Sequence, residues 1–183
     1  MTQPPHPATP LLRPLTLVGL MGVGKTSLGK RLAARLGVPF VDSDDEIEAA
    51  ARCSISDIFA RYGEPHFRQL EARVIERLIS ERTQLVLATG GGAFMNEGTR
   101  RLLLNKTEVI WLRAPLAVLV ERTSRRANRP LLKQGDPATI LAGLMKKRYP
   151  VYAEAPLVLD VDERPMDDTV EALLALTGKE GPR

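Results

Sequence analysis

The eight residues from Gly19 to Thr26, GLMGVGKT, constrain the fold of this chain more than any other segment. They match the pattern G-x-x-x-x-G-K-[ST], in which glycines let successive backbone N–H groups turn inward around phosphate oxygens. The apolar run 15–20 precedes this pattern, and Leu28, Leu32 and Leu36 follow it at helical spacing. The segment therefore predicts a phosphate-binding loop between a buried strand and a helix, whose positive N-terminal end also attracts anions.

Two side chains of this loop have expected roles of their own. We expect the Lys25 ammonium to contact the β- and γ-phosphates of a nucleotide and the Thr26 hydroxyl to be a ligand of Mg²⁺. Gly22 and Gly24 also suit the dinucleotide fingerprint G-x-G-x-x-G, but Ser27 stands where its third glycine is required. The phosphate loop is thus favoured, and its predicted nucleotide-binding residues are Gly22, Val23, Gly24, Lys25, Thr26 and Ser27.

Short apolar runs alternate with helical patterns along the rest of the chain. We expect strands within 15–20, 39–44, 84–92, 108–112 and 157–161. Helical patterns occur at 28–36, 64–81, 97–104, 115–126, 137–148 and 167–176. Ser43, followed three residues later by Glu46, has the capping-box pattern of a further helix start. This alternation favours a three-layer α/β/α domain with a central five-stranded parallel sheet, whose ligands bind beyond the carboxyl ends of the strands.

Length and composition bound the organisation of the molecule. A chain of 183 residues, 44% hydrophobic and 26% charged, is typical of one globular domain, which we expect over 14–178. Five prolines within the first fourteen residues predict a disordered tail over 1–13, and the polar residues 179–183 are expected to fray. No apolar run approaches the ~20 residues of a membrane helix, and the single Cys53 excludes an internal disulfide. We expect a cytoplasmic monomer.

Carboxylates directly follow the second predicted strand. Asp42 and Asp44 stand at its carboxyl end, where they could hold Mg²⁺ and orient an acceptor hydroxyl. The alternative is that these acids only favour a helix start through the helix dipole. We interpret Asp45 and Glu46 in that second way, and Asp42 and Asp44 as site residues.

These residues belong to a longer series of motifs: GLMGVGKT, the D-S-D of 42–44, GEPHFRQLE from Gly63, GGGAF from Gly90, RPLL from Arg129 and RYPVY from Arg148. Together the motifs resemble shikimate kinase, over Pro14 to about Leu176. The order and spacing of the motifs carry the resemblance. It implies transfer of the ATP γ-phosphate to the 3-hydroxyl of shikimate, in the pathway to aromatic amino acids. It also implies the phosphate-loop fold of the nucleoside-monophosphate kinase group, with a mobile lid.

Two arginines and a glycine run form the expected substrate site. Arg68 and Glu71 are three residues apart on one predicted helix, so the carboxylate can hold the guanidinium in place. A guanidinium held in this way, with a second at Arg148, suits a substrate carboxylate, although either arginine could belong to a surface ion pair. The motif match favours the site role, and Asp44 is implied to bind the substrate hydroxyls and draw off the proton. The expected substrate-binding residues are Asp44, Arg68, Gly90, Gly91, Gly92 and Arg148.

The segment from about 122 to 135 is rich in basic residues and poor in apolar ones. It is either a solvated helix end and loop or, as the resemblance implies, the lid that closes over the polyphosphate. Arg129 is then implied to stabilise charge on the transferring group, and Arg122 to reach the nucleotide. No Asp stands in the third predicted strand, so Asp42 is implied to share Mg²⁺ with Thr26, through water. Arg164 aligns across a gap with a family position that packs against adenine.

Three other function classes fit part of the sequence. A gluconate-type kinase would share the phosphate loop and the acidic strand end, but not the whole series of motifs. The segment Asn105–Glu108 resembles the N-K-x-D of nucleotide-switch proteins, yet its acid is Glu, it precedes a strand, and no D-x-x-G exists. A net charge of +4 suits nucleic acid, but only 4% of the residues are aromatic and the basic residues are scattered. We expect small-molecule partners, shikimate and ATP, and neither nucleic acid nor membrane.

Overall fold

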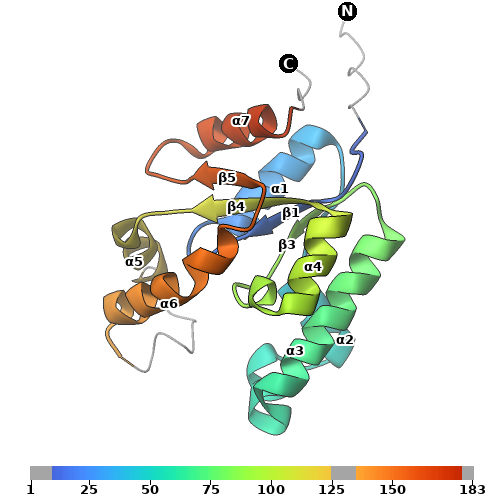
Figure 1. Ribbon diagram of the computed structural model, residues 1–183, viewed down its shortest axis with the longest axis vertical. Coiled ribbons are helices and arrows are strands. Elements are labelled where there is room, and N and C mark those ends of the chain that lie inside the picture. The colour runs from blue at the N-terminus through green and yellow to red at the C-terminus, as the bar shows by residue number, and fades with distance from the viewer. Residues whose placement is uncertain (1–9, 125–134, 179–183) are drawn as a thin grey trace, which may run out of the picture.

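The computed structural model describes residues 10–124 and 135–178, and it has a central sheet with helices on both faces (Figure 1). The strands are β1 (Leu15–Val18), β2 (Phe40–Asp42), β3 (Val86–Ala88), β4 (Glu108–Arg113) and β5 (Leu157–Asp160). They lie in the order β2-β3-β1-β4-β5, and every neighbouring pair is parallel. The predicted three-layer fold with a five-stranded parallel sheet is confirmed.

Helices connect the strands and cover the two faces of the sheet. They are α1 (Lys25–Leu36), α2 (Ser43–Ala51), α3 (Ile55–Glu81), α4 (Glu97–Lys106), α5 (Leu116–Ser124), α6 (Pro137–Tyr152) and α7 (Met166–Leu176), with a short 3₁₀ turn η1 (Ala93–Met95). Helices α1 and α7 pack together on one face, whereas α3 and α4 pack together on the other. No helix within the described ranges is long and apolar enough to cross a membrane.

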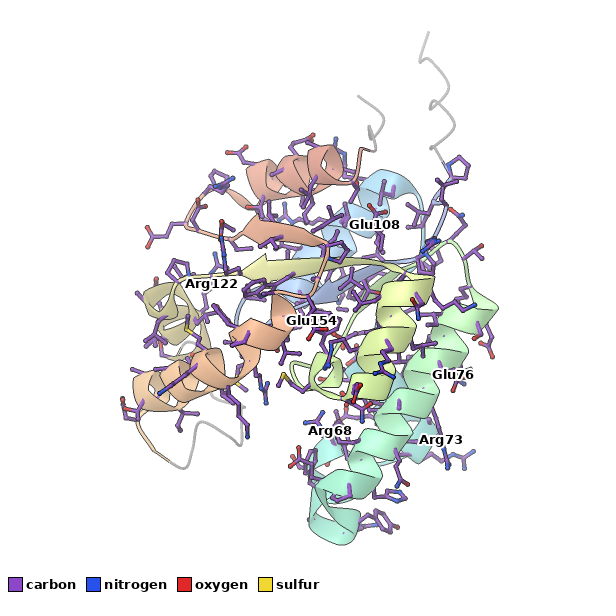
Figure 2. The ribbon with its side chains drawn as sticks, viewed as in Figure 1. Arg68, Arg73, Glu76, Glu108, Arg122 and Glu154 are labelled. Atoms are coloured by element: carbon purple, nitrogen blue, oxygen red, sulfur yellow. The ribbon has the colours of Figure 1, made fainter. Side chains whose placement is uncertain are left out.

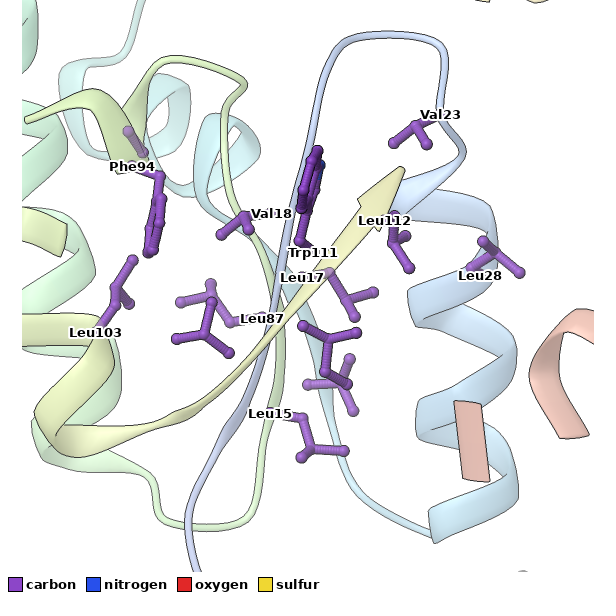
Figure 3. Packing of buried hydrophobic residues seen from close by; sticks show 14 of the residues in the cluster. Leu15, Leu17, Val18, Val23, Leu28, Leu87, Phe94, Leu103, Trp111 and Leu112 are labelled. Atoms are coloured by element: carbon purple, nitrogen blue, oxygen red, sulfur yellow. The ribbon is translucent and has the colours of Figure 1, made fainter. Parts of the chain in front are cut away.

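The core consists mainly of aliphatic side chains on both faces of the central strands. Every residue of β1 and β3 is buried. Figure 3 shows Leu28 of α1 on one side of these strands, and Phe94 and Leu103 on the other. Burial on both faces explains why these strands read as continuous apolar runs, without the alternation of a half-exposed sheet.

The start of α2 differs from the sequence prediction. The capping box predicted at Ser43 and Glu46 is wrong, because the N-cap is Asp42, whose carboxylate accepts a hydrogen bond from the Asp44 N–H at 3.1 Å. The Ser43 hydroxyl instead accepts the N–H of Gly90 at 3.1 Å. Ser43 therefore ties the start of α2 to the loop that follows β3.

Helix α3 begins nine residues before the predicted helix 64–81, at Ile55. Ser54 and Asp57 form a reciprocal capping box there, a pattern present in the sequence that the prediction overlooked. The helix breaks at Gly63, whose φ of 77° lies in the left-handed region that glycine tolerates. Pro65 then falls in the first turn of the second half, where a missing N–H leaves no hydrogen bond unmade.

The described chain is anchored earlier than the predicted domain start at residue 14. Leu11 is 3% exposed, its N–H donates to Gln84 Oε1 at 2.9 Å, and its carbonyl accepts Gln84 Nε2 at 2.7 Å. The predicted tail 1–13 is therefore wrong for its last residues, because an apolar side chain can dock an extended segment despite flanking prolines. Residues 1–9 and 179–183 lie outside the described ranges.

Candidate active site

The candidate site lies where the sheet topology changes direction. Neighbouring strands β1 and β3 continue into α1 and α4, which cover opposite faces, so their loops diverge at the carboxyl ends. A crevice at such a point is the usual ligand site of an open parallel sheet. The cavity found there is lined by Met21, Gly22, Gly24, Lys25, Thr26, Ser27, Asp42, Asp44, Thr89, Gly90, Gly91, Arg122 and Met166.

The phosphate loop has the geometry expected from its sequence. Gly24 has a φ of 105° and is the N-cap of α1, which carries no side-chain cap. Backbone N–H groups at such a helix start, with the positive end of the helix behind them, suit an anion. Lys25 Nζ donates to the carbonyls of Gly19 at 2.7 Å and Leu20 at 3.1 Å, which holds the ammonium against the loop. Val23 is 1% exposed, so its side chain packs into the core.

Two oxygen groups at the mouth of this loop suit a hard cation. The Thr26 hydroxyl donates to Asp42 Oδ2 at 2.8 Å, which places both predicted magnesium ligands together. Mg²⁺ keeps several waters and typically takes one or two protein ligands beside substrate phosphates, so this pair fits that ion. No cluster of three or more His, Cys, Asp or Glu that could enclose a metal exists in the described residues.

The buried carboxyl group of Glu71 and the partly buried one of Asp44 face the first glycine of the run that follows β3. A Cβ added at Gly90 would lie 2.7 Å from Asp44 Oδ1 and 3.0 Å from Glu71 Oε1. Neither of these oxygens has a hydrogen-bond partner. Burial, reinforced by Asp42, raises the pKa of Asp44 to about 6, although Lys25 opposes this. Burial likewise raises the pKa of Glu71 to about 7 against the lowering effect of Arg68. Both groups therefore titrate close to neutral pH.

Arginines approach the same glycine run from α3 and α6. Arg68 Nη1 lies 2.7 Å from Glu71 Oε2, which confirms the predicted brace, and the Glu71 side chain is only 2% exposed. An added Cβ at Gly92 would overlap the Arg68 guanidinium. Arg148 Nη1 donates to the Gly91 carbonyl at 2.9 Å. The structure therefore brings both predicted carboxylate-binding arginines to the glycine run, and Figure 2 shows Arg68 on α3.

Of the three remaining predicted residues, the structure places one in the cavity lining. Arg122 lines the cavity on the α5 side (Figure 2) and donates to the carbonyls of Val23 at 3.2 Å and Asp162 at 2.9 Å. Arg164 is exposed, pairs with the Asp162 carboxylate at 2.6 Å and is not among the residues that line the cavity. Arg129 lies outside the described residues, as does most of the predicted lid.

Some residues of the site escaped prediction. Met21, Thr89 and Met166 line the cavity, and Tyr152 contacts Gly91 through its hydroxyl. Met166 reaches the cavity from the start of α7, far from the phosphate loop in sequence. Met21 lies within the phosphate-loop motif and Tyr152 is the last residue of RYPVY, so the motifs pointed to both positions, whereas Thr89 and Met166 carry no comparable signal.

A family model described as "Shikimate kinase" matches residues 21–177. The chain belongs to this family. It is 50% identical over 163 residues to a shikimate kinase of Rhodopseudomonas palustris, covering 89% of this chain and 80% of that protein. A solved shikimate kinase from Acinetobacter baumannii, in complex with shikimate, is 40% identical with a TM-score of 0.85, over 90% of this chain and 92% of that one.

A gluconokinase structure from Sinorhizobium meliloti 1021 bears on the gluconate-type alternative. It covers 93% of this chain and 94% of its own, with a TM-score of 0.61, but is only 17% identical. That likeness concerns the fold alone. The family membership therefore confirms the resemblance inferred from the series of motifs.

Proposed function

We infer that this protein is an ATP-dependent kinase that transfers the γ-phosphate of ATP to the 3-hydroxyl of shikimate, giving shikimate 3-phosphate and ADP. The observation that carries this conclusion is that, in a fold of the shikimate kinase family, two groups of polar residues lie at the carboxyl ends of the neighbouring strands β1 and β3. The phosphate loop follows β1, and the glycine run with its arginines and carboxyl groups follows β3. A donor phosphate and an acceptor hydroxyl bound there would lie beside each other.

On the nucleotide side, each residue has a role that its position supports. The backbone N–H groups from Gly22 to Ser27 bind phosphate oxygens, and Lys25 places its charge against the β- and γ-phosphates. Thr26 would hold Mg²⁺, with Asp42 contributing through water. The bound ion would neutralise charge on the phosphates. Lys25 then stabilises the charge that spreads over the transferring group.

On the acceptor side, the residues bind and orient shikimate. Arg68 and Arg148 bind its carboxylate through charge-assisted hydrogen bonds, and the glycine run allows the ring to approach the backbone. Asp44 accepts a hydrogen bond from the acceptor hydroxyl and can take its proton. Because phosphoryl transfer passes through a loose transition state, alignment of this oxygen matters more than early proton removal.

Three further assignments rest mainly on the resemblance. Arg122 contacts the nucleotide, which its place in the cavity lining supports. We propose that Arg129 stabilises the transferring phosphoryl group from a lid at about 122–135, and that Arg164 packs against adenine.

A coupled assay of ADP release tests the function directly. Turnover with shikimate should be high, whereas gluconate and nucleoside monophosphates should give almost none. Chelation of divalent cations with EDTA should abolish the turnover, and added Mg²⁺ should restore it. Equal turnover with gluconate would favour the gluconate-type alternative and contradict the proposal.

The setting of the reaction is also part of the proposal. We propose that the protein acts as a cytoplasmic monomer on small molecules, without nucleic acid or membrane partners. Several exposed arginines are already paired with carboxylates, as Arg31 is with Asp167 at 2.5 Å and Arg77 with Glu46 at 3.0 Å, which leaves less free charge for a polyanion. Light scattering of the purified protein tests the monomeric state.

A further inference from the structure

We propose that Tyr152 is a positioning residue of the reaction, whose hydroxyl fixes the glycine run of the shikimate site. This inference rests on the proposed function. Tyr152 is the last residue of α6 and is 1% exposed. Its hydroxyl donates a hydrogen bond to the carbonyl oxygen of Gly91. No step of the reaction outlined above makes use of this group.

The Gly91 carbonyl has two donors, and both come from α6. Arg148 precedes Tyr152 by four residues, about one helical turn, and its Nη1 donates to the same oxygen at 2.9 Å. A carbonyl oxygen has two lone pairs, so this pair of donors uses its full capacity. The tyrosine thus shares an acceptor with a guanidinium that we assign to the substrate carboxylate.

Because the peptide bond is planar, hydrogen bonds that hold the Gly91 carbonyl also orient the peptide that follows it. The bond between Gly91 and Gly92 is trans, so the Gly92 N–H points away from the carbonyl that α6 holds. The two flanking carbonyls are fixed as well, since Gly90 O accepts the Ala93 N–H at 3.1 Å and Gly92 O accepts the Met95 N–H at 3.0 Å. The orientation of the run is therefore fixed by hydrogen bonds to its three carbonyls, together with the bond from the Gly90 N–H to the Ser43 hydroxyl.

Packing alone does not account for a tyrosine at this position. The ring of Tyr152 lies 6.3 Å from that of Phe94 and 5.9 Å from that of Trp111, a setting that phenylalanine would also fill. Burial raises the pKa of Tyr152 to about 12, although Arg148 opposes this, so the hydroxyl stays a donor at neutral pH. The hydroxyl is therefore the part of the side chain that acts on the site.

The test compares Tyr152→Phe with Tyr149→Phe. The Tyr149 hydroxyl also donates to a backbone carbonyl, that of Ala114 at 2.8 Å, but this acceptor is neither in the glycine run nor in the cavity lining. Loss of a hydrogen bond at Tyr152 should lower kcat/KM for shikimate by roughly 2- to 12-fold, mainly through KM. The KM for ATP should stay within about twofold of wild type, whereas Tyr149→Phe should leave both KM values nearly unchanged.

A second readout does not depend on the substrate. Hydrogen exchange of the Ala93 and Met95 amides should accelerate several-fold in Tyr152→Phe and not in Tyr149→Phe, because these amides bond to the carbonyls of the run. Unchanged exchange, or equal changes in the two KM values, would overturn the positioning role. If wild type failed to phosphorylate shikimate while exchange accelerated as expected, the proposed function would be wrong and the anchor would stand.

Discussion

Removal of Arg68 should destabilise the protein in a pH-dependent way, because its partner is a buried acid. The guanidinium also pairs with Glu64 at 3.1 Å, but that carboxylate is 64% exposed and contributes at most about 1 kcal/mol. The pair with Glu71 at 2.7 Å is different, since Glu71 is 2% exposed. A buried ion left without its partner would cost about 3–5 kcal/mol if it stayed ionised.

Glu71 can lower this cost by taking up a proton. Its pKa is already raised by burial to about 7 and is held down by Arg68, so Arg68→Ala should raise it further. When burial raises the pKa of an acid in the folded state, the protein loses stability as the pH rises from the unfolded-state pKa of that acid to its folded-state pKa. The loss is about 1.4 kcal/mol per pH unit. In wild type this loss levels off near pH 7, but in the variant it continues above that.

The free energy of unfolding, measured with urea at pH 6.5 and pH 8.0, tests this reasoning. The loss caused by Arg68→Ala should be larger at pH 8.0 by about 1 kcal/mol. The difference should vanish in a comparison of Glu71→Gln with Arg68→Ala/Glu71→Gln, because the titrating group is gone. Arg77→Ala, which breaks an exposed pair with Glu46, is the surface control and should show little dependence on pH. An equal loss at both pH values for Arg68→Ala would refute the argument.

The remaining predictions concern catalysis. Gly92→Ala should displace the guanidinium of Arg68 and lower kcat/KM for shikimate by about 10-fold or more, whereas Gly143→Ala, with nothing within 4 Å of the added Cβ, should leave it unchanged. Asp44→Asn should weaken shikimate turnover but not ATP binding in calorimetry. In wild type, kcat/KM should fall below about pH 6, because the Asp44 carboxyl acts in its ionised form and its pKa is raised to about 6. The Asp44→Asn variant should not show this fall. Lys25→Met should lower kcat about 10²-fold or more in steady-state assays, while a near-wild-type rate would mean that the ammonium is not at the γ-phosphate.

Prediction of the local elements succeeded where one interaction dominates. Apolar runs buried on both faces, such as β1, were located because a short continuous apolar run that ends at glycines is typical of a strand in a parallel sheet. Helix ends were less certain, because several polar side chains can compete for the same backbone donors. Asp42 caps α2, although Ser43 also had the pattern, and the choice depends on where Gly90 lies in space.

The phosphate loop and the brace between Arg68 and Glu71 could be predicted from the sequence, because each depends on residues close together in the chain. The alternation of strand and helix patterns also indicated a parallel sheet, although not its strand order. By contrast, only the three-dimensional fold shows that Asp44 and Glu71 face Gly90 together, and that Tyr152 reaches Gly91 across 61 positions. Such contacts depend on strand order, and on burial that makes an ordinary carboxyl titrate near neutral pH. Neither strand order nor burial is encoded in local spacing, since both arise from how the helices pack across the sheet.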